Sequence, residues 1–258
     1  MRIDIATLFP EMCEAVLSES IVGRARRAGH IQVVCHQIRD YSQDKRRRVD
    51  DYGYGGGKGM VMQADPIFRC HQAICRELGG PVHTIYLSPQ GKVLTQERCV
   101  ELSRLPGLLL LCGHYEGVDE RVLETVVDEE LSIGDYVLTG GELPALVLAD
   151  AVARMCPGVL AAEECFQEES HFGGLLEYPQ YTRPEVWEGR PVPEVLLSGH
   201  HGNVDRWRQK QRLLRTLQKR PDMMARYQPT KLDQKLLEEI RREDEGLVQD
   251  ACNVENFV

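Results

Sequence analysis

The run of apolar residues Leu108–Cys112 constrains the fold more than any other part of this 258-residue chain. It is too short for a typical helix and is followed by a glycine, so it predicts a strand. Because the run contains no polar alternation, both faces of this strand must be buried. Strands of this kind are typical of parallel sheets that are covered by helices on both sides.

The rest of the first 160 residues alternates between strand and helix patterns. Strands are predicted at Arg2–Phe9, Ile31–Ile38, Val82–Leu87 and near Glu130–Ile133. Helices are predicted from Pro10 to about Arg27, from the cap Asp65-Pro66 to Leu78, from the cap Thr95 to Arg104, at Asp119–Thr125 and at Gly140–Met155. Strands that alternate with helices predict an α/β fold with a mainly parallel sheet.

The pattern changes after Val159. Ala161–Ser170 carries four glutamates and few apolar residues, which is typical of a linker. From Leu175 onward the pattern is helical, most clearly at Val204–Lys219 and Thr230–Arg242. We therefore predict an α/β domain at 1–160, a mobile linker at 161–174 and a helical domain at 175–258.

The composition of the chain predicts where the protein is located and that its cysteines are free thiols. No apolar stretch reaches 18 residues and the N-terminus lacks the apolar core of a signal peptide, so we expect no membrane segment and a cytoplasmic protein. The nine cysteines lie mostly in apolar segments, as buried free thiols do in a reducing compartment. Cys70, His71 and Cys75 do not have zinc-ligand spacing, so burial is preferred over metal binding there.

The net charge of −9 counts against a nucleic-acid partner, but the distribution of charge counts in favour of one. Lys45–Arg48 is a basic cluster, and Val204–Arg220 holds seven basic residues and one acid. At helical spacing, one face of the second segment presents cations and the opposite face is apolar. The cations are Arg208, Arg212, Arg215 and Lys219, and the apolar residues are Trp207, Leu213, Leu214 and Leu217. This face predicts phosphate contacts, with a solvated charged face as the alternative.

The glycine-rich segment Gly53–Gly59 does not fit a phosphate loop. The positions of the first glycine and of the hydroxyl residue of that motif hold Tyr52 and Gly59, and the G-x-G-x-x-G spacing is also absent. No G-x-S-x-G elbow occurs, which counts against a hydrolase. Because the segment follows a basic cluster, it is either an RNA-backbone contact or a solvated loop.

Three turns follow predicted strands, at Ser88–Gly91, Gly113–Gly117 and Ser132–Pro144. In α/β sheets, ligands gather at such carboxyl ends, so the three turns predict one composite cleft. Glycines and apolar residues with few charges suit a purine held by backbone groups better than a triphosphate. Ordinary tight turns remain the alternative for each turn taken alone.

Several motifs run in order through most of the chain: Leu8-Phe-Pro-Glu-Met12, Val49-Asp-Asp51, Tyr54-Gly-Gly-Gly57, Tyr86-Leu-Ser-Pro-Gln-Gly91, Cys112-Gly-His-Tyr-Glu-Gly-Val-Asp-Glu-Arg121, Ile133-Gly-Asp-Tyr-Val-Leu-Thr-Gly-Gly-Glu-Leu-Pro144, Pro157-Gly-Val159, Tyr181-Thr-Arg-Pro-Glu185 and Val195-Leu-Leu-Ser-Gly199. Together they resemble one family, the bacterial tRNA (guanine-N1)-methyltransferases (TrmD) of the SPOUT class.

The resemblance implies an α/β fold with a deep trefoil knot, and a homodimer whose active sites use residues of both subunits. It implies S-adenosylmethionine as the cofactor, an association with magnesium whose ligands no sequence pattern locates, and tRNA as the partner. The expected product is tRNA methylated at N1 of guanosine 37, just 3′ of the anticodon, when a guanosine precedes it.

The resemblance also implies site residues. Those expected at the cofactor are Tyr86, Leu87, Ser88, Pro89, Gly113, Glu116, Ile133, Gly134, Asp135, Tyr136, Val137, Leu138, Gly140, Gly141 and Pro144. The basic glycine-rich loop and the basic helix face, taken by themselves, give the residues expected at tRNA, which are Arg46, Asp50, Gly55, Gly56, Gly59, Arg208, Arg212, Arg215 and Lys219.

Arg154 matches the family's catalytic arginine, and Glu169 stands where the family commonly has an aspartate base. This departure adds one methylene, which shifts the reach and orientation of the carboxylate. The neighbouring Glu168 is the other candidate base, and His171 interrupts the family's Ser-Phe pair. The hypothesis is that Glu169 removes the N1 proton while Arg154 stabilises the charge on O6. Taken without the resemblance, Arg154 is a helix-end cation and Glu169 a solvated linker acid.

Three other functions compete with this hypothesis: a non-catalytic RNA-binding protein, a SPOUT enzyme acting on ribosomal RNA or ribose, and a phosphate-loop nucleotidase. The carboxylate and arginine pair favours a base nitrogen over a ribose hydroxyl, and the glycine spacing counts against the nucleotidase.

Overall fold

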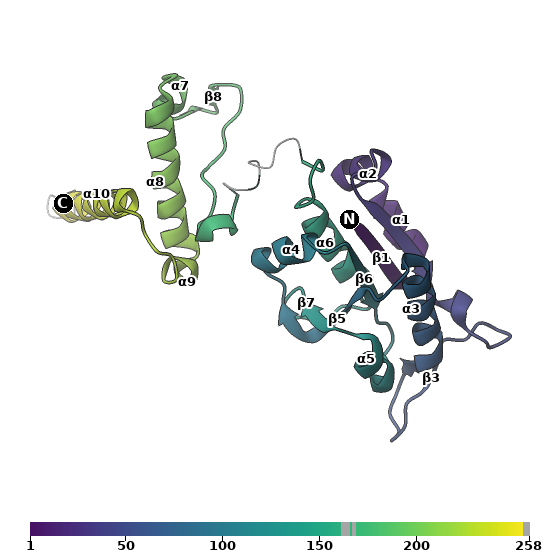
Figure 1. Ribbon diagram of the computed structural model, residues 1–258. Helices are drawn as coiled ribbons and strands as arrows, with labels where there is room; N and C mark the ends of the chain where they lie inside the picture. The colour runs from purple at the N-terminus through teal and green to yellow at the C-terminus, as the bar shows by residue number, and fades with distance from the viewer. Residues whose placement is uncertain (161–165, 167–168, 255–258) are drawn as a thin grey trace. The chain divides into compact units, whose positions relative to one another are not determined.

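The computed structural model describes residues 1–160, 166 and 169–254, with side chains described up to residue 243. It divides into two compact units, unit 1 at Met1–Glu163 and unit 2 at Glu164–Val258 (Figure 1). Of the predicted linker 161–174, residues 161–165, 167 and 168 lie outside the described residues. The assignment of that linker therefore stays a prediction.

Unit 1 is built on a five-stranded sheet in the order β2-β1-β6-β5-β7. Its strands are β1 (Arg2–Thr7), β2 (Gln32–Gln37), β5 (His83–Val93), β6 (Gly107–Cys112) and β7 (Glu129–Ser132). Every pairing in this sheet is parallel. The predicted α/β fold with a mainly parallel sheet is therefore confirmed.

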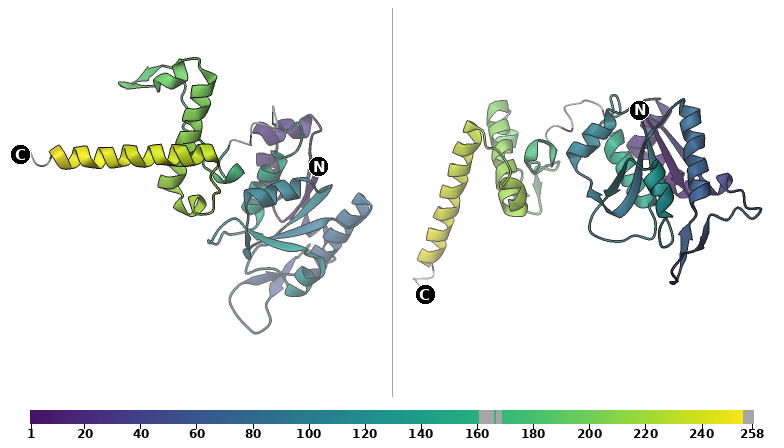
Figure 2. Two further views of the ribbon diagram at one scale, coloured as in Figure 1. Left: turned by 60° about the vertical axis from the view of Figure 1, so that its left-hand side comes forward. Right: turned by 60° about the horizontal axis from the view of Figure 1, so that its bottom comes forward.

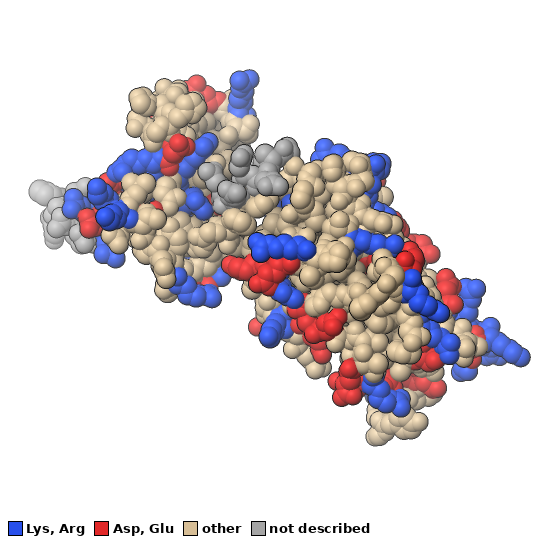
Figure 3. Space-filling view, in the orientation of Figure 1, with Lys and Arg blue, Asp and Glu red and all other residues tan. Residues whose placement is uncertain are grey.

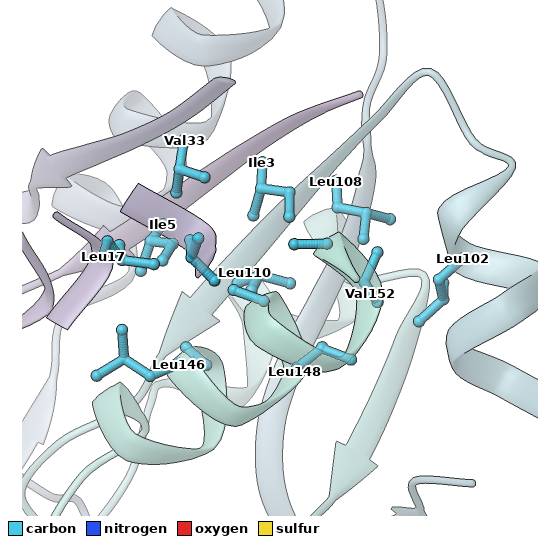
Figure 4. Packing of buried hydrophobic residues seen from close by; sticks show 14 of the residues in the cluster. Ile3, Ile5, Leu17, Val33, Leu102, Leu108, Leu110, Leu146, Leu148 and Val152 are labelled. Carbon is cyan, nitrogen blue, oxygen red and sulfur yellow. The ribbon is translucent and has the colours of Figure 1, made fainter. Parts of the chain in front are cut away.

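Helices cover both faces of the sheet (Figures 1 and 2). One layer contains α1 (Pro10–Leu17), α2 (Ser20–Arg27), α4 (Gln96–Ser103) and α6 (Glu142–Ala153). The other contains the short 3-10 helix Ile38–Tyr41, α3 (Ala64–Leu78) and α5 (Glu120–Val126). Along β6, Leu108 and Leu110 enter the first core, which Figure 4 shows, whereas Leu109 and Leu111 enter the second. The prediction that this strand is buried on both faces is confirmed.

Three local predictions were wrong. The helix expected over 10–27 divides into α1 and α2, because the chain turns after Leu17 and the Ser18 carbonyl packs against Gly23, whose position leaves no room for a Cβ. Helix α3 begins at Ala64, and Asp65 lies in its first turn, where it pairs with Arg69 at 2.7 Å instead of capping the helix. Strand β5 continues through the predicted turn Ser88–Gly91, where its register against β7 shifts.

A hairpin of β3 (Asp50–Tyr52) and β4 (Met60–Met62) carries the glycine-rich segment. The two strands are short, and Figure 1 shows the hairpin extending away from the body of unit 1. Its inner end is anchored because Met62 is completely buried in the second core. The outer end, residues 51–59, is exposed.

Unit 2 is mainly helical, with a short hairpin that the sequence did not predict. Its elements are the 3-10 turn Phe172–Gly174, β8 (Val186–Trp187), β9 (Arg190–Pro191), α7 (Glu194–Leu197), α8 (His201–Lys219), α9 (Pro221–Met224) and α10 (Lys231–Val254). A small core of Leu175, Leu213, Leu236 and Ile240 joins α8 to α10. Within the described residues of both units, the helices are too short or too polar to cross a bilayer.

A buried ionic network joins β1 to its neighbours. The Asp4 side chain is completely buried, where Arg2 donates to it at 2.8 Å and the His36 ring nitrogen Nε2 lies 2.7 Å from it. Burial raises the pKa of Asp4, but the hydrogen bonds from His36 and Arg2 outweigh this effect, so the net pKa lies below the ordinary value. A carboxylate with a depressed pKa stabilises the fold at every pH above its unfolded pKa.

We predict that Asp4→Asn lowers the free energy of unfolding by about 3–5 kcal/mol at pH 7, because it removes one partner from a buried ionic cluster. The difference from the wild type should stay constant down to about pH 4 and shrink only below it, where the wild-type carboxylate also loses its charge. Urea unfolding of both proteins between pH 7 and pH 3 measures this. A difference that grows in acid would contradict the assignment.

Candidate functional site

A cavity of about 390 Å³ lies where the carboxyl ends of β5, β6 and β7 meet the first turn of α6. Its size is within the range of small-molecule sites. The walls come from three segments that are far apart in sequence, at residues 86–90, 113–123 and 130–144. The structure thus brings the three segments predicted as turns together around one cleft, although the first of them is part of β5. All of the predicted cofactor residues line it except Asp135, which is not part of the wall.

The cavity wall is more charged than the sequence suggested. Glu116, Glu120 and Glu130 line it, whereas lysine and arginine do not occur among its lining residues. The expectation of few charges was wrong because Glu120 and Glu130 belong to α5 and β7, outside the three turns. A wall of this charge favours a ligand that carries positive charge and opposes a triphosphate.

Two glycines let the segments of the cavity approach closely. The Gly141 N–H donates to the Gly113 carbonyl at 2.8 Å, and a Cβ on Gly141 would lie only 2.8 Å from the Cys112 Cα. At Gly113, a Cβ would meet the Tyr86 hydroxyl at 2.7 Å. Burial, together with the neighbouring Glu130 and Glu120 carboxylates, raises the pKa of Tyr86 to about 12. The phenol therefore keeps its proton at neutral pH and can donate a hydrogen bond.

A buried carboxylate behind the cavity was not predicted. Glu142 is 3% exposed and accepts a hydrogen bond from the Thr7 hydroxyl at 2.8 Å. Its other oxygen lies 3.9 Å from Nδ1 of His114, which lines the cavity. A Cβ on Gly140 would collide with both of these side chains. Glu142 and His114 lie within motifs quoted above, but only the packing shows that they meet.

Arg154 lies at the opposite end of α6 from the cavity. Helix α6 begins at Glu142, beside the cavity, and Arg154 is its C-terminal cap. Twelve residues at 1.5 Å per residue place about 18 Å of rigid helix between the two ends. This is farther than an arginine side chain reaches, so the structure does not bring Arg154 to the cavity of its own chain.

The predicted base Glu169 belongs to unit 2. Its backbone N–H donates to the Phe166 carbonyl at 3.2 Å, and its carbonyl accepts from the Phe172 N–H at 3.3 Å. His171 follows in a left-handed conformation with φ of 72°. The alternative base Glu168 lies outside the described residues.

The predicted tRNA-contact residues of unit 1 gather on and beside the β3–β4 hairpin. Gly55, Gly56 and Gly59 lie in its exposed tip, each with positive φ, and Asp50 begins β3. Arg46 is exposed in the preceding loop. On the face seen in Figure 3, acidic and basic side chains are interspersed over unit 1.

The basic residues of α8 divide into two groups. Arg206 pairs with Glu239, and Lys210 pairs with Glu243 at 2.6 Å, so α10 neutralises these two. Within the described side chains, no carboxylate forms an ion pair with Arg212, Arg215 or Lys219, and Arg208 pairs with Asp205 of its own helix at 3.7 Å. Arg208 also lies over the Tyr178 ring. The four cations predicted to face a ligand are therefore those of α8 that do not pair with α10, and three of them have no carboxylate partner among the described side chains.

The apolar face predicted for α8 was only partly right. Leu213 is fully buried, but Leu217 is exposed, and Thr216 is buried in its place. The buried Thr216 hydroxyl is satisfied because it accepts from the Leu176 N–H at 2.9 Å. The packing partner of α8 thus includes the extended chain around Leu175, which helical periodicity alone does not reveal.

One pair of metal-ligating side chains lies on α3, where the Cys75 sulfur is 3.6 Å from the His71 ring one turn away. In the part of the chain that the structure describes, no group of three or more histidine, cysteine or acidic side chains is arranged to hold a metal ion.

Comparison with known proteins gives one consistent match. A family model described as tRNA (Guanine-1)-methyltransferase TrmD matches residues 1–226. Two similar proteins are named tRNA (guanine-N(1)-)-methyltransferase. The one from Ruminiclostridium cellulolyticum is 58% identical over 223 residues, which are 86% of this chain and 96% of the relative. The one from Chloroflexus aurantiacus is 56% identical over 244 residues, 93% of this chain and 96% of the relative.

We predict that Gly141→Ala destabilises the protein by about 1–3 kcal/mol, because the added methyl group meets backbone atoms of β6 that cannot rotate away. Gly80→Ala is the matched control, since a Cβ there meets nothing within 4 Å. Its free energy of unfolding should stay within about 0.5 kcal/mol of the wild type. Equal urea-unfolding midpoints for the two variants would show that the loops do not need this close contact.

Proposed function

The chain belongs to the TrmD family and is a tRNA (guanine-N1)-methyltransferase, and from this premise we propose that it transfers the methyl group of S-adenosylmethionine to N1 of guanosine 37. The observation that carries the proposal is the cavity at the carboxyl ends of β5, β6 and β7.

The cavity fits such a donor in size, polarity and charge. Glycine backbone at Gly113, Gly140 and Gly141 can approach a flat adenosine closely, and the apolar side chains of Leu87 and Leu138 also line the space. The three glutamates of the wall complement the positive charges of a sulfonium and an ammonium group. Bound there, S-adenosylmethionine supplies an activated methyl group.

The chain's own residues would then act on the guanine. N1 of guanine carries a proton at neutral pH, so a base must remove it, and we assign this role to the Glu169 carboxylate. The negative charge that develops on O6 needs a positive partner, and we assign the Arg154 guanidinium to it. Both residues have interactions within the chain, so the proposal is that RNA binding redirects them.

A dimer with shared sites follows from the position of Arg154. Because α6 separates Arg154 from the cavity of its own chain, the arginine that serves this cavity must come from a second copy. The outer faces of α1 and α6 suit such a contact. Met12 and Val16 of α1 and Leu143 and Val147 of α6 are large apolar side chains left exposed, and the two helices pack side by side.

The proposed tRNA contacts use charges that the fold leaves free. Arg212, Arg215 and Lys219 of α8 lack carboxylate partners among the described side chains, so they can neutralise phosphates without first breaking an ion pair. Arg206 and Lys210 would have to give up Glu239 and Glu243.

We also propose the trefoil knot that the family resemblance implies. Its support is the contact between two segments that are distant in sequence: the loop after β6 and the loop before α6 join through the hydrogen bond from Gly141 to Gly113. Magnesium remains part of the proposal without assigned ligands.

We predict that the protein, incubated with a labelled methyl donor, labels a tRNA transcript that has guanosine at position 37 and leaves the adenosine-37 transcript unlabelled. Adenine presents an unprotonated N1 and no O6, so the proposed base and arginine have nothing to act on. Nuclease digestion and chromatography against methylguanosine standards identify the position of the methyl group. Label in both transcripts, or on another guanine nitrogen, would contradict the proposal.

We predict that Arg154→Ala lowers kcat about 10²- to 10³-fold, the loss typical of one electrostatic group at a developing anion. Mixed dimers of this variant with the cavity variant Gly141→Ala should recover about half of wild-type activity. One of their two sites then combines an intact cavity with an intact arginine.

The matched control places both substitutions in one chain and pairs it with a wild-type chain. Each site of that mixed dimer lacks one component, so no recovery is expected. Half of wild-type activity in this control, together with none in the first mixed dimer, would show that Arg154 serves its own chain, and the shared-site proposal would fail.

A further inference from the structure

Tyr54 stands out because nothing in the described chain covers it. It lies at the tip of the β3–β4 hairpin and is fully exposed at 101%, while Tyr52 on the same hairpin is 79% exposed. Some other exposed aromatic residues, such as Tyr181 beside Trp207, have an aromatic neighbour. Leaving a whole aromatic ring in water forgoes the stabilisation that burial gives, so a partner outside the chain is the natural explanation.

The hairpin is fixed to the wall of the cavity at its inner end. The Met62 N–H donates to the Gly117 carbonyl at 2.9 Å, and the Glu116 N–H donates to the Met60 carbonyl at 3.0 Å. The Glu116 carboxylate also lies directly over Gly59, where a Cβ would come within 2.4 Å of it. Since Glu116 and Gly117 line the cavity, the hairpin holds Tyr54 in a defined relation to it.

The surroundings of Tyr54 indicate the chemistry of the partner. Its neighbours in the tip are glycines and Lys58, and the exposed Lys45 and Arg46 precede the hairpin. Among the described side chains, these three cations form no ion pair with a carboxylate. A protein interface would need apolar neighbours around the ring, and the tip has none. An exposed aromatic ring beside the unpaired cation Lys58, with two further such cations in the loop before the hairpin, is suited to an unpaired nucleobase and its phosphates.

We propose that the Tyr54 ring stacks on an unpaired base of the tRNA anticodon loop, beside the target guanosine. This rests on the proposed function. A base in a helical stem has both faces covered, whereas a loop base can offer one face to the ring. Stacking tolerates any base, so Tyr54 positions the RNA and does not read its sequence.

The proposal predicts a specific kinetic signature. A stack made equally in the bound complex and in the transition state contributes to KM and leaves kcat unchanged. Tyr54→Ala should therefore raise KM for tRNA about 5- to 150-fold, the range for losing one aromatic–base stack, with kcat at saturating tRNA and the Kd for S-adenosylmethionine unchanged. Tyr54→Phe should keep the wild-type KM, and Tyr54→Leu, which is apolar but has no π-face, should behave like Tyr54→Ala.

Val93→Ala is the control for loss of an exposed apolar side chain outside the hairpin, and it should leave KM unchanged. A wild-type KM for Tyr54→Ala, or an equal rise for Tyr54→Phe, would overturn the proposal. A loss of self-association in Tyr54→Ala, measured by sedimentation, would overturn it too, because the ring would then face a second copy of the chain.

A second measurement identifies the base without requiring methyl transfer. The added indole of Tyr54→Trp should be quenched by an isolated anticodon stem–loop, measured as the difference from the wild type with its two native tryptophans. One abasic substitution in the loop should abolish the quenching and also remove the KM penalty of Tyr54→Ala. Quenching that survives every abasic substitution would overturn the stack. An inactive wild-type enzyme with intact quenching would refute the proposed function and leave the stack standing.

Discussion

The hydrogen bond from the Gly141 N–H to the Gly113 carbonyl oxygen holds together the two loops on which the site depends. One loop ends a strand from the centre of the sheet, and the other begins the helix that packs under it. Neither could approach the other if Gly141 carried a side chain, because its Cβ would collide with the backbone of β6. The shape of the cavity therefore depends on contact between backbone atoms of the two loops, and these loops in turn position the side chains that line it.

The same contact fixes where the chemistry can occur. Helix α6 starts directly after this contact, beside the cavity. Arg154 is at the other end of the helix, about 18 Å away. Under the proposed function, a single chain holds the methyl donor and cannot deliver its own arginine to it. Exposed apolar side chains on α1 and α6 offer a place for the second chain that would complete the site.

The pairing of individual charged side chains decides where a polyanion can bind, and the net charge of the chain does not. The chain carries a net charge of −9, yet α8 and the region of the β3–β4 hairpin present cations that have no acidic partner among the described side chains. On α8 the division is made by α10, whose Glu239 and Glu243 occupy Arg206 and Lys210 and leave the other face of the helix available. A polyanion can therefore bind an acidic protein where tertiary packing has left the basic groups unpaired.

Patterns within a few residues determined the α/β class, the burial of β6 on both faces and the basic face of α8, because strand and helix periodicity are local properties. They failed where a distant segment decided the outcome. The break between α1 and α2 depends on packing of the Ser18 carbonyl against Gly23, and the buried Thr216 hydroxyl is satisfied by the Leu176 N–H.

The motifs of the chain named almost every residue of the cavity wall, but they could not place those residues relative to one another. Only the tertiary structure decided that Glu120 and Glu130 line the cavity, that Glu142 lies close to His114, and that Arg154 stands at the opposite end of α6 from the cavity. The sequence specifies which side chains exist and which face of an element they occupy. The order of the strands and the direction of α6 decide which of them meet, since those depend on contacts between residues far apart in the chain.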